Sequence, residues 1–555
     1  MENQISQQKY NILALDDEQL ILMMISACLK DTQYQVTISD RAENALETFK
    51  QKEFDAIITD IMMDSIDGFM FRDMVRSLNP RIPIIFFTSL IDDINNSLIQ
   101  RILNDNYSYY INKNFSRKLL LEKLDQIVTS YRAQNELIQL NQRVEKDMEM
   151  ATEVQQTVLP PWIYLDDNCE FSYIYRPYFK ISGDLFDWFP LDDNHYLMVF
   201  GDISGHGIHS ALAMVAVQSL LKQMLTADSS QMHQPHLILN KLNAYFSEKL
   251  KMRLYMTCLI CIWSFKTNTV VFHNAGHPDM LCIHTSDGGA VSTNIHKKGN
   301  LPVGMMASTE YREEDNVSFQ FSEDSMFLIF SDGVTDLRNE DHNRTGVDMD
   351  TLLQLASVIA KDNCSFNTPF RLCSTLEQIG FTQVTDDLTV LALKKYSPGN
   401  NKSELRLKVF PDPVSIERAM QKTEAYIVTT FDSKVLADKV KILLHEFLVN
   451  IAKHNEENAQ NDSGVIAVHI TGDSRKLSIT IWDQGENTEY SSPLQSEESL
   501  KKLSQELADE QKQSDHGIPL ILKFSPQIKR RHYCGVNETV FMIQYTKGSK
   551  NGCDN

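Results

Sequence analysis

The sequence has no excess of positive charge and no long apolar run. Its 555 residues carry 53 Lys and Arg against 74 Asp and Glu, which gives a formal net charge of −21. This acidity argues against general nucleic-acid binding, which needs a basic face, and against binding to an anionic membrane. No run approaches the roughly 18 apolar residues of a membrane span, and segment 1–10 has no apolar signal core. We expect a cytoplasmic protein.

Cysteine is scarce and scattered. The nine cysteines are odd in number, which fits a reducing compartment. Cys258 and Cys261 form a lone CxxC in the apolar stretch 256–263, without the second pair that a zinc site needs. We predict that both are strand residues. The hydrophobic share of 42% is normal for a globular protein, and at about 150 residues per domain the length predicts three or four domains.

Residues 1–125 are predicted to form an α/β domain. Short apolar runs alternate there with helical patterns, and the runs are 11–15, 56–59, 82–88 and 107–111. Such a βα repeat predicts a parallel sheet with helices on both faces.

Residues 115–159 contain no glycine, proline or histidine and are rich in Leu, Gln, Glu and Lys. They predict one long helix that links two domains. An apolar stripe at heptad spacing, interrupted by Asp147, consists of Leu137, Leu140, Val144, Ala151, Val154 and Val158. The stripe is either the seam of a coiled-coil homodimer or a face packed on the next domain. The missing histidine excludes the phospho-acceptor helix of a histidine kinase.

The rest of the chain divides into two further units. Residues 160–396 alternate β-rich runs with helical segments, which predicts a layered α+β domain. The polar segment 396–404 is predicted to be a linker. Residues 405–547 form a third globular unit, and we expect a disordered tail at 548–555.

In the first domain, carboxylates follow the strands. Asp16 and Asp17 come after the first strand and Asp60 after the third, while Thr88 ends the fourth and Lys113 follows the fifth. Ligand sites of open α/β sheets form at this edge, and clustered carboxylates favour Mg²⁺. Together these groups can accept and hold a phosphoryl group.

This set resembles the receiver domains of response regulators, which have a flavodoxin-like fold. The resemblance implies that Asp60 accepts the phosphoryl group and that Asp16, Asp17 and the Met62 carbonyl hold Mg²⁺. It further implies that Thr88 and Lys113 bind the phosphoryl group, that Tyr110 is an aromatic switch, and that a histidine kinase or phosphotransfer protein acts upstream. The family usually has proline where Asp64 and Asn114 stand, and the Asp64 charge is expected to slow phosphorylation.

In the central domain, isolated aspartates lie beside glycines where strands meet turns. They are Asp184 after Gly183, Asp202 after Gly201, Asp332 before Gly333, and the pair Asp386-Asp387. Glycine lets a backbone approach an ion closely, and oxygen ligands suit Mg²⁺ or Mn²⁺. A two-metal site of this kind can activate water against a phosphate ester.

These motifs, with Asn274-Ala275-Gly276-His277-Pro278 and Leu301-Pro302-Val303-Gly304, resemble the SpoIIE-like branch of the type-2C metal-dependent phosphatases, which are αββα sandwiches. The resemblance implies a protein-serine/threonine phosphatase whose substrates are phosphorylated anti-sigma-factor antagonists of the STAS type. It assigns Asp184, Asp202, Asp332, Asp386 and the Ile203 carbonyl to two or more metals, and it prefers Asp386 to Asp387. His206 and His277 either assist proton transfer or make backbone hydrogen bonds.

In the third unit, a predicted helix at 437–454 places Glu446 and Asn450 on one polar face. Asp483 and Gly485 follow a predicted strand, and a long polar stretch separates them from Gly517. The set resembles the GHKL (Bergerat-fold) ATPases, specifically the anti-sigma-factor serine kinases. The resemblance implies ATP-Mg²⁺ binding, with Glu446 as catalytic base, Asn450 on Mg²⁺, Asp483 on adenine, and Gly485 and Gly517 shaping the pocket.

Asp515 departs from that pattern, because the family usually has glycine there. A carboxylate near the phosphates should weaken ATP binding. The domain is therefore either an active kinase, a binding module that sequesters its partner, or an ATP sensor. The three domains together resemble a partner-switching regulator, in which kinase and phosphatase act on one antagonist protein in opposite directions and Asp60 phosphorylation sets the balance.

Overall fold

The computed structural model describes the chain apart from residues 1–8, 89–99, 103, 206, 228, 251–253, 287–288, 296–298, 340–345, 360–363, 397–403, 458–463, 474, 486–526 and 546–555. The expected tail and most of the expected linker thus lie outside the described residues. The chain divides into two compact units, Met1–Asp147 and Met148–Asn555.

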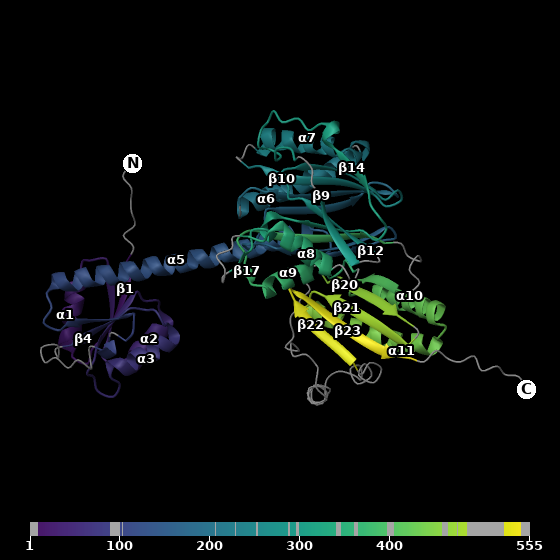
Figure 1. Cartoon of the computed structure of the whole chain (residues 1–555). Coiled ribbons are helices and arrows are strands. Elements are labelled where there is room, and N and C mark those ends of the chain that lie inside the picture. The colour runs from purple at the N-terminus through teal and green to yellow at the C-terminus, as the bar shows by residue number, and fades with distance from the viewer. Residues whose placement is uncertain are drawn as a thin grey trace, which may run out of the picture. The chain divides into compact units, whose positions relative to one another are not determined.

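The first unit contains a five-stranded parallel sheet of order β2-β1-β3-β4-β5. Its strands are β1 Tyr10–Leu15, β2 Tyr34–Ser39, β3 Ala56–Asp60, β4 Ile84–Thr88 and β5 Ser108–Asn112. Its helices are α1 Gln19–Leu29, α2 Ala42–Gln51, α3 Gly68–Leu78 and the start of α5, Arg117–Val158. In the inner strands β1, β3 and β4, alternate residues fill separate cores on the two faces, such as Ile12 and Leu13. The flavodoxin-like prediction is confirmed (Figure 1).

Helix α5 confirms the long helix predicted from the missing glycine and proline, with 42 residues in one element. Its first turns belong to the receiver-like core, because Leu120, Leu124, Val128 and Tyr131 are buried there. The core of this unit therefore extends past residue 125.

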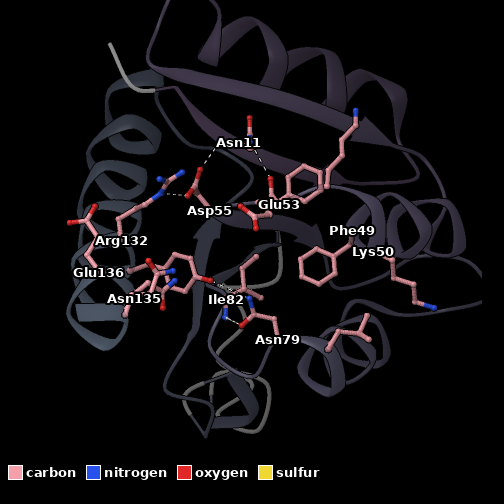
Figure 2. A pocket seen from close by; sticks show the side chains of 15 residues that line it. Asn11, Phe49, Lys50, Glu53, Asp55, Asn79, Ile82, Arg132, Asn135 and Glu136 are labelled. Atoms are coloured by element: carbon pink, nitrogen blue, oxygen red, sulfur yellow. Dashed lines mark hydrogen bonds and ion pairs between the residues drawn. The ribbon is translucent and has the colours of Figure 1, made fainter. Parts of the chain in front are cut away.

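A polar cavity of about 610 Å³ lies where α5 crosses the edge of the sheet opposite Asp60. There Arg132 of α5 forms an ion pair with the buried Asp55, which also accepts a hydrogen bond from the Asn11 backbone N–H at 2.7 Å (Figure 2). Tyr131 accepts a hydrogen bond from Asn79 at 3.2 Å. Because Asp55 directly precedes β3 and Asp60 ends it, one strand connects the α5 anchor to the carboxylate cluster.

Two antiparallel sheets form the centre of the second unit, with orders β14-β11-β10-β9-β8 and β13-β12-β15-β18-β7-β6. The strands are β6 Ile163–Leu165, β7 Cys169–Arg176, β8 Asp184–Pro190, β9 His195–Ile203, β10 Met256–Ser264, β11 Thr269–Ala275, β12 Met280–Ser286, β13 Gly289–Ile295, β14 Val317–Gln320, β15 Met326–Phe330 and β18 Leu388–Lys395, with a small pair β16 Arg338–Asn339 and β17 Phe381–Gln383. Cys258 and Cys261 are buried in β10, as predicted.

Helices cover the outer faces of both sheets. Helices α6 Ile208–Ala227 and α7 Pro235–Tyr245 pack on the first sheet, and α8 Met349–Ile359 and α9 Thr368–Gln378 on the second. Aromatic side chains, including Phe171, Phe186 and Trp263, fill the space between the sheets. This arrangement confirms the αββα prediction. Short helical turns are η2 Ser229–His233, η3 Phe246–Leu250, η4 Glu313–Asp315 and η5 Asp332–Val334.

Helix α6 is, among the described residues, the one helix long and apolar enough to cross a membrane. Its Met214, Val217 and Leu221 are buried against the first sheet, so it is accounted for as a core helix.

The C-terminal part is an antiparallel sheet of order β19-β20-β21-β23-β22 with two helices on one face (Figure 1). Its elements are β19 Glu404–Val409, α10 Pro413–Phe431, α11 Lys434–Glu457, β20 Ile466–Gly472, β21 Lys476–Asp483, β22 Gln527–Tyr533 and β23 Val536–Gln544. Val440, Leu443, Leu444 and Leu448 of α11 pack into a core with this sheet. A sheet with helices on one face is the α/β sandwich of the Bergerat fold, which the resemblance implied and the structure confirms.

The central and C-terminal parts share one hydrophobic core. Val465, Ala467, Trp482 and Val536 of the C-terminal part belong to the cluster that fills the αββα sandwich. Trp162 donates a hydrogen bond from Nε1 to the Val465 carbonyl at 3.0 Å.

A buried ionic network crosses the same boundary. Arg406 of β19 pairs with Glu170 of β7, and both side chains are almost completely buried. Arg406 also contacts Glu404 at 3.0 Å, which accepts from His469 at 2.9 Å. Burial alone would raise the pKa of Glu404, but His469 and Arg406 lower it to about 2. The two parts are therefore joined by matched charges as well as by apolar contact.

Candidate active sites

The carboxylates predicted at the sheet edge of the first unit lie together. Carboxylate oxygens of Asp16, Asp17 and Asp60 are all within 4.8 Å of one another. The Lys113 ammonium lies 2.9 Å from Asp60 and 3.1 Å from Asp16. Burial raises the pKa of Asp16, while Asp60 and Asp16 raise the pKa of Lys113 against the lowering effect of burial. Three carboxylates facing one ammonium leave an excess of negative charge, which one divalent cation would neutralise.

Local structure holds this edge in place. A Cβ on Gly68 would lie 2.0 Å from the Asp60 carbonyl oxygen, so only glycine lets α3 begin against the end of β3. Asp67 caps α3 by accepting the Met70 N–H at 2.7 Å. Thr88 is buried at the end of β4, and its carbonyl accepts the Lys113 N–H at 3.0 Å. Met62 and Tyr110 have exposed side chains.

The second candidate site lies at one end of the αββα sandwich. Asp184 begins β8 and is the cross-strand partner of Asp202 in β9. Asp332 begins η5 directly after β15, and Asp386 precedes β18, the strand paired with β15. Both sheets therefore deliver carboxylates to one place.

The carboxylates of this cluster repel one another. Burial, followed by the charges of Asp332, Asp386 and Asp387, raises the pKa of Asp202 to about 8. Burial and Asp386 raise the pKa of Asp332 to about 6. Burial and Asp202 raise the pKa of Asp184. Cations bound among these aspartates would offset their mutual repulsion and favour the charged carboxylates.

The donor set fits divalent metal ions. The Oδ1 atom of Asp184 is buried without a hydrogen-bond partner, while Thr389 donates to Oδ2. An unpaired buried carboxylate oxygen is costly unless a ligand fills the position.

Two glycines let the segments that carry the aspartates approach one another closely. A Cβ on Gly333 would lie 2.0 Å from the Asp387 carbonyl oxygen, and one on Gly183 would lie 2.9 Å from the Ile203 carbonyl oxygen. Gly333 thus brings Asp332 against the Asp386-Asp387 turn. Gly183 brings Asp184 against Ile203, the residue whose carbonyl was predicted to be a ligand.

Asp387 has a different environment from Asp386. Its carboxylate accepts backbone N–H groups of Tyr178 and Gly183, both at 2.7 Å. Its oxygens are therefore engaged in holding the segment that leads to Asp184. Thr389 and Asp387 support the cluster, and the sequence analysis assigned no role to either.

Gln155 of α5 is a further residue that sequence reasoning missed. It is buried, donates from Nε2 to the Ser182 carbonyl at 2.7 Å, and accepts the Ser182 N–H at Oε1 at 3.0 Å. The Ser182 hydroxyl in turn accepts the Asp184 N–H at 3.0 Å. The end of the connecting helix is therefore two hydrogen bonds from a candidate metal ligand. Helical periodicity gave no signal for Gln155, because nothing distinguishes it from the other polar residues of α5.

For the metal-dependent phosphatase activity that the sequence motifs imply, replacing Gln155 by leucine is expected to raise the Mn²⁺ concentration needed for half-maximal activity about 10- to 100-fold, the usual effect of losing a residue that orients a metal ligand. Leucine leaves both backbone groups of Ser182 without their partner. The metal dependence of activity measures this. Gln142→Leu, at an exposed position of the same helix, is the matched control. Equal metal dependence in both variants would remove the role of Gln155.

The sequence left the roles of His206 and His277 open, and the structure describes only one of the two. His206 lies outside the described residues. His277 is buried, and burial lowers its pKa to about 3. Asn274 brackets it by accepting the His277 N–H and donating to its carbonyl, at 2.7 and 2.8 Å. This environment favours a neutral core histidine over a proton-transfer group.

The third candidate site lies in the C-terminal part. Asp483 ends β21 and is buried, and its Oδ1 accepts the Gly485 N–H at 2.9 Å and the Asn537 amide at 2.8 Å. Its Oδ2 is buried without a hydrogen-bond partner, which leaves an acceptor for a ligand amino group such as that of adenine. The residues described thus fit a nucleotide base.

Glu446 and Asn450 lie one turn apart on α11 and are partly exposed, while the opposite face of the helix is buried. Gly517, Asp515 and the polar stretch before them lie outside the described residues. Of the residues discussed for the phosphate side of the predicted nucleotide site, the structure therefore describes only Glu446 and Asn450 of α11.

Three protein families match successive parts of the chain. The response regulator receiver domain matches residues 12–125, stage II sporulation protein E (SpoIIE) matches 192–396, and the histidine kinase-like ATPase domain matches 410–543.

Among characterised proteins, phosphoserine phosphatase RsbP of Bacillus subtilis is 25% identical over 198 residues, or 36% of this chain and 47% of its own length. Phosphoserine phosphatase RsbU of Bacillus subtilis is 22% identical over 280 residues, or 50% of this chain and 79% of its own length. The chain thus spans less than half of RsbP. The crystal structure of the RsbU and RsbW domains of Rv1364c from Mycobacterium tuberculosis aligns with 72% of this chain and 99% of its own, at 16% identity and a TM-score of 0.37.

Proposed function

Because the chain combines a response regulator receiver domain, a SpoIIE-type domain and a histidine kinase-like ATPase domain in this order, we propose that it is a receiver-controlled phosphatase. The central domain removes phosphate from phosphoserine or phosphothreonine in a partner protein. The observation that carries this proposal is the set of converging aspartates with a buried, unpaired oxygen on Asp184.

In this proposal, Asp184, Asp202, Asp332, Asp386 and the Ile203 carbonyl hold Mg²⁺ or Mn²⁺. The metals, when bound, supply an activated water and neutralise the charge of the phosphate ester. Thr389 fixes one oxygen of Asp184 and leaves the other for the metal. Asp387 holds the segment 178–183 by its backbone amides, which keeps Asp184 in register with Asp202.

The receiver domain controls this activity. Asp60 accepts a phosphoryl group from an upstream histidine kinase or phosphotransfer protein, while Asp16, Asp17 and the Met62 carbonyl hold Mg²⁺. In this proposal Lys113, whose ammonium is 2.9 Å from Asp60, and Thr88, at the end of the strand next to β3, bind the phosphoryl oxygens. The α5 helix carries the change, since Arg132 anchors it to the receiver sheet and Gln155 binds the segment before Asp184.

The substrate we propose is a phosphorylated STAS-type anti-sigma-factor antagonist in the cytoplasm. Two proteins similar to this chain are named phosphoserine phosphatases, which supports the substrate class. Treating the full chain with acetyl phosphate and Mg²⁺ should change the Mn²⁺-dependent dephosphorylation rate severalfold, and Asp60→Asn should abolish the change. An unchanged rate in the wild-type chain would refute receiver control.

The C-terminal domain carries a second proposed activity, phosphorylation of the same antagonist. Glu446 acts as base, Asn450 holds Mg²⁺, Asp483 binds adenine, and Gly485 and Gly517 shape the pocket. The unpaired Oδ2 of Asp483 supports nucleotide binding. Incubation with labelled ATP and antagonist should transfer label, and Glu446→Ala should prevent it.

The competing role is an ATP sensor or binding module without transfer. Trp482 precedes Asp483 and packs on Phe366 of the central domain, with ring centroids 6.1 Å apart. Glu538, next to Asn537, accepts from both Trp482 and Asn367, at 3.1 and 3.3 Å. Under this role, ATP changes the phosphatase rate without label transfer, and Asp483→Asn removes the response.

The apolar stripe of α5 favours a homodimer. Leu137, Leu140, Val144 and Val154 are all exposed. The side chains of Glu149, Thr152 and Gln155, which lie off the stripe, make polar contacts with the αββα domain. We expect Leu140→Asp/Val144→Asp to halve the mass measured by light scattering, with Gln142→Asp as the control. A wild-type chain that is monomeric at every concentration tested would contradict the dimer.

A further inference from the structure

A cluster of two histidines and one aspartate lies away from the three sites above. Asp192 Oδ2 is 2.9 Å from His195 Nδ1 and 3.1 Å from His233 Nε2, and the three ligand atoms lie within 4.8 Å of one another. His195 begins β9, and Asp202 lies seven residues further along the same strand. At about 3.3 Å per residue, the cluster is roughly 23 Å from the phosphatase aspartates.

We propose that Asp192, His195 and His233 form a separate site for a borderline divalent transition metal, of which Zn²⁺ is the best match. Two imidazole nitrogens and one carboxylate oxygen are ligands typical of Zn²⁺, with water completing a tetrahedron. The phosphatase and receiver clusters offer oxygen ligands alone, so they favour Mg²⁺ or Mn²⁺. The chain would therefore separate two classes of metal by ligand type.

The backbone holds these ligands before any metal arrives. Asp192 Oδ1 accepts the N–H groups of Asn194 and His195, at 2.8 and 2.9 Å, which fixes the aspartate in the β8–β9 hairpin. His233 ends η2 beside Met232, which is completely buried in the core under α6 and α7. Anchored ligands of this kind need little reorganisation to bind an ion.

The geometry leaves room for the remaining ligand. The imidazole rings are nearly perpendicular, at 75°, with centroids 5.3 Å apart. All three side chains are roughly one-third to one-half exposed, so water can reach the ion. The site joins the β8–β9 hairpin to the connection between α6 and α7, segments 41 residues apart in sequence. A bound metal would stabilise this end of the phosphatase domain, because it links two segments of the folded chain.

Metal binding can be measured on the chelator-treated full-length chain, with excess Mg²⁺ present to fill the oxygen sites. Titration with Zn²⁺ should show one equivalent that Asp192→Asn and His233→Gln bind at least about tenfold more weakly, equal to ~1.4 kcal/mol. Asp193→Asn and His209→Gln change exposed residues of the same types and should bind as the wild type does. Co²⁺ in this site should absorb visible light strongly, as four-coordinate Co²⁺ does, and the absorption should be lost in the same two variants.

The alternative is a trio held by hydrogen bonds alone. In that case the wild type and Asp192→Asn would bind the same number of Zn²⁺ ions with equal affinity, and Zn²⁺ would not raise the melting temperature of the wild type above that of the variant. Either result overturns the proposal. Asparagine can still accept the two backbone hydrogen bonds made by Asp192 Oδ1, so the hairpin should fold in the variant.

Discussion

Replacing Asp202 by asparagine should lower phosphatase activity about 1000-fold or more, because a metal contributes several kcal/mol to the transition state and each 1.4 kcal/mol is tenfold in rate. Asp202 is the cross-strand partner of Asp184 and feels the charges of Asp332 and Asp386. In the proposed metal site we therefore expect Asp202 to contact both ions. Phosphate release from a phosphoserine protein at saturating Mn²⁺ measures the loss.

The same variant should not lose stability without metal. Asparagine removes one charge from a cluster of repelling carboxylates, so the free energy of unfolding in chelator should stay equal or rise. Asp193→Asn, an exposed residue of the β8–β9 hairpin, is the control for both measurements. An Asp202→Asn protein that keeps activity within tenfold of wild type would remove Asp202 from the metal site.

Replacing Arg406 by methionine should cost about 3–5 kcal/mol of unfolding free energy, because it leaves the buried Glu170 carboxylate without its partner. Glu170 would keep one hydrogen bond, from Ser365 at 2.6 Å. Urea unfolding followed by tryptophan fluorescence is the measurement, since Trp162 and Trp482 both lie in the core shared by the two domains.

The double variant Glu170→Met/Arg406→Met should recover at least half of that loss, because two apolar side chains can replace a buried ion pair at little cost. Comparing the single and double variants separates the interaction energy between Glu170 and Arg406 from the interactions that each makes with its surroundings. Lys434→Met breaks a solvent-screened surface pair with Glu424 and should change stability far less than Arg406→Met does. Equal, small effects of Arg406→Met and Lys434→Met would show that the network does not hold the domains together.

Local patterns in the sequence predicted the folds, and they also pointed to carboxylates that the fold brings to shared edges. Asp60, Asp202 and Asp332 each lie where an apolar strand meets a turn, and topology brings strand ends to one edge. The glycine beside Asp332 was also informative, since a Cβ at Gly333 would collide with the Asp387 carbonyl. Side chains that lie at strand ends or in tight turns can thus be recognised from the sequence as candidates for one site.

Residues that act across long sequence separations gave no such signal. Glu170 and Arg406 are 236 residues apart, and each taken alone is an ordinary charged residue on a strand. Asp192 and His233 meet only because the hairpin and the α6–α7 connection fold together. Gln155 is one of many polar residues on α5, and only its burial against Ser182 distinguishes it. Tertiary packing, which no local pattern encodes, selects these residues.

The most direct test of a receiver-controlled phosphatase is one rate measured in two states of Asp60. The full chain is incubated with a phosphoserine STAS-type antagonist and Mn²⁺, with and without prior phosphorylation of the receiver by acetyl phosphate. The account predicts phosphate release that requires Mn²⁺ and Asp202 and changes severalfold on phosphorylation in the wild type but not in Asp60→Asn. A wild-type rate that does not change on phosphorylation, or phosphate release that persists in Asp202→Asn, would contradict it.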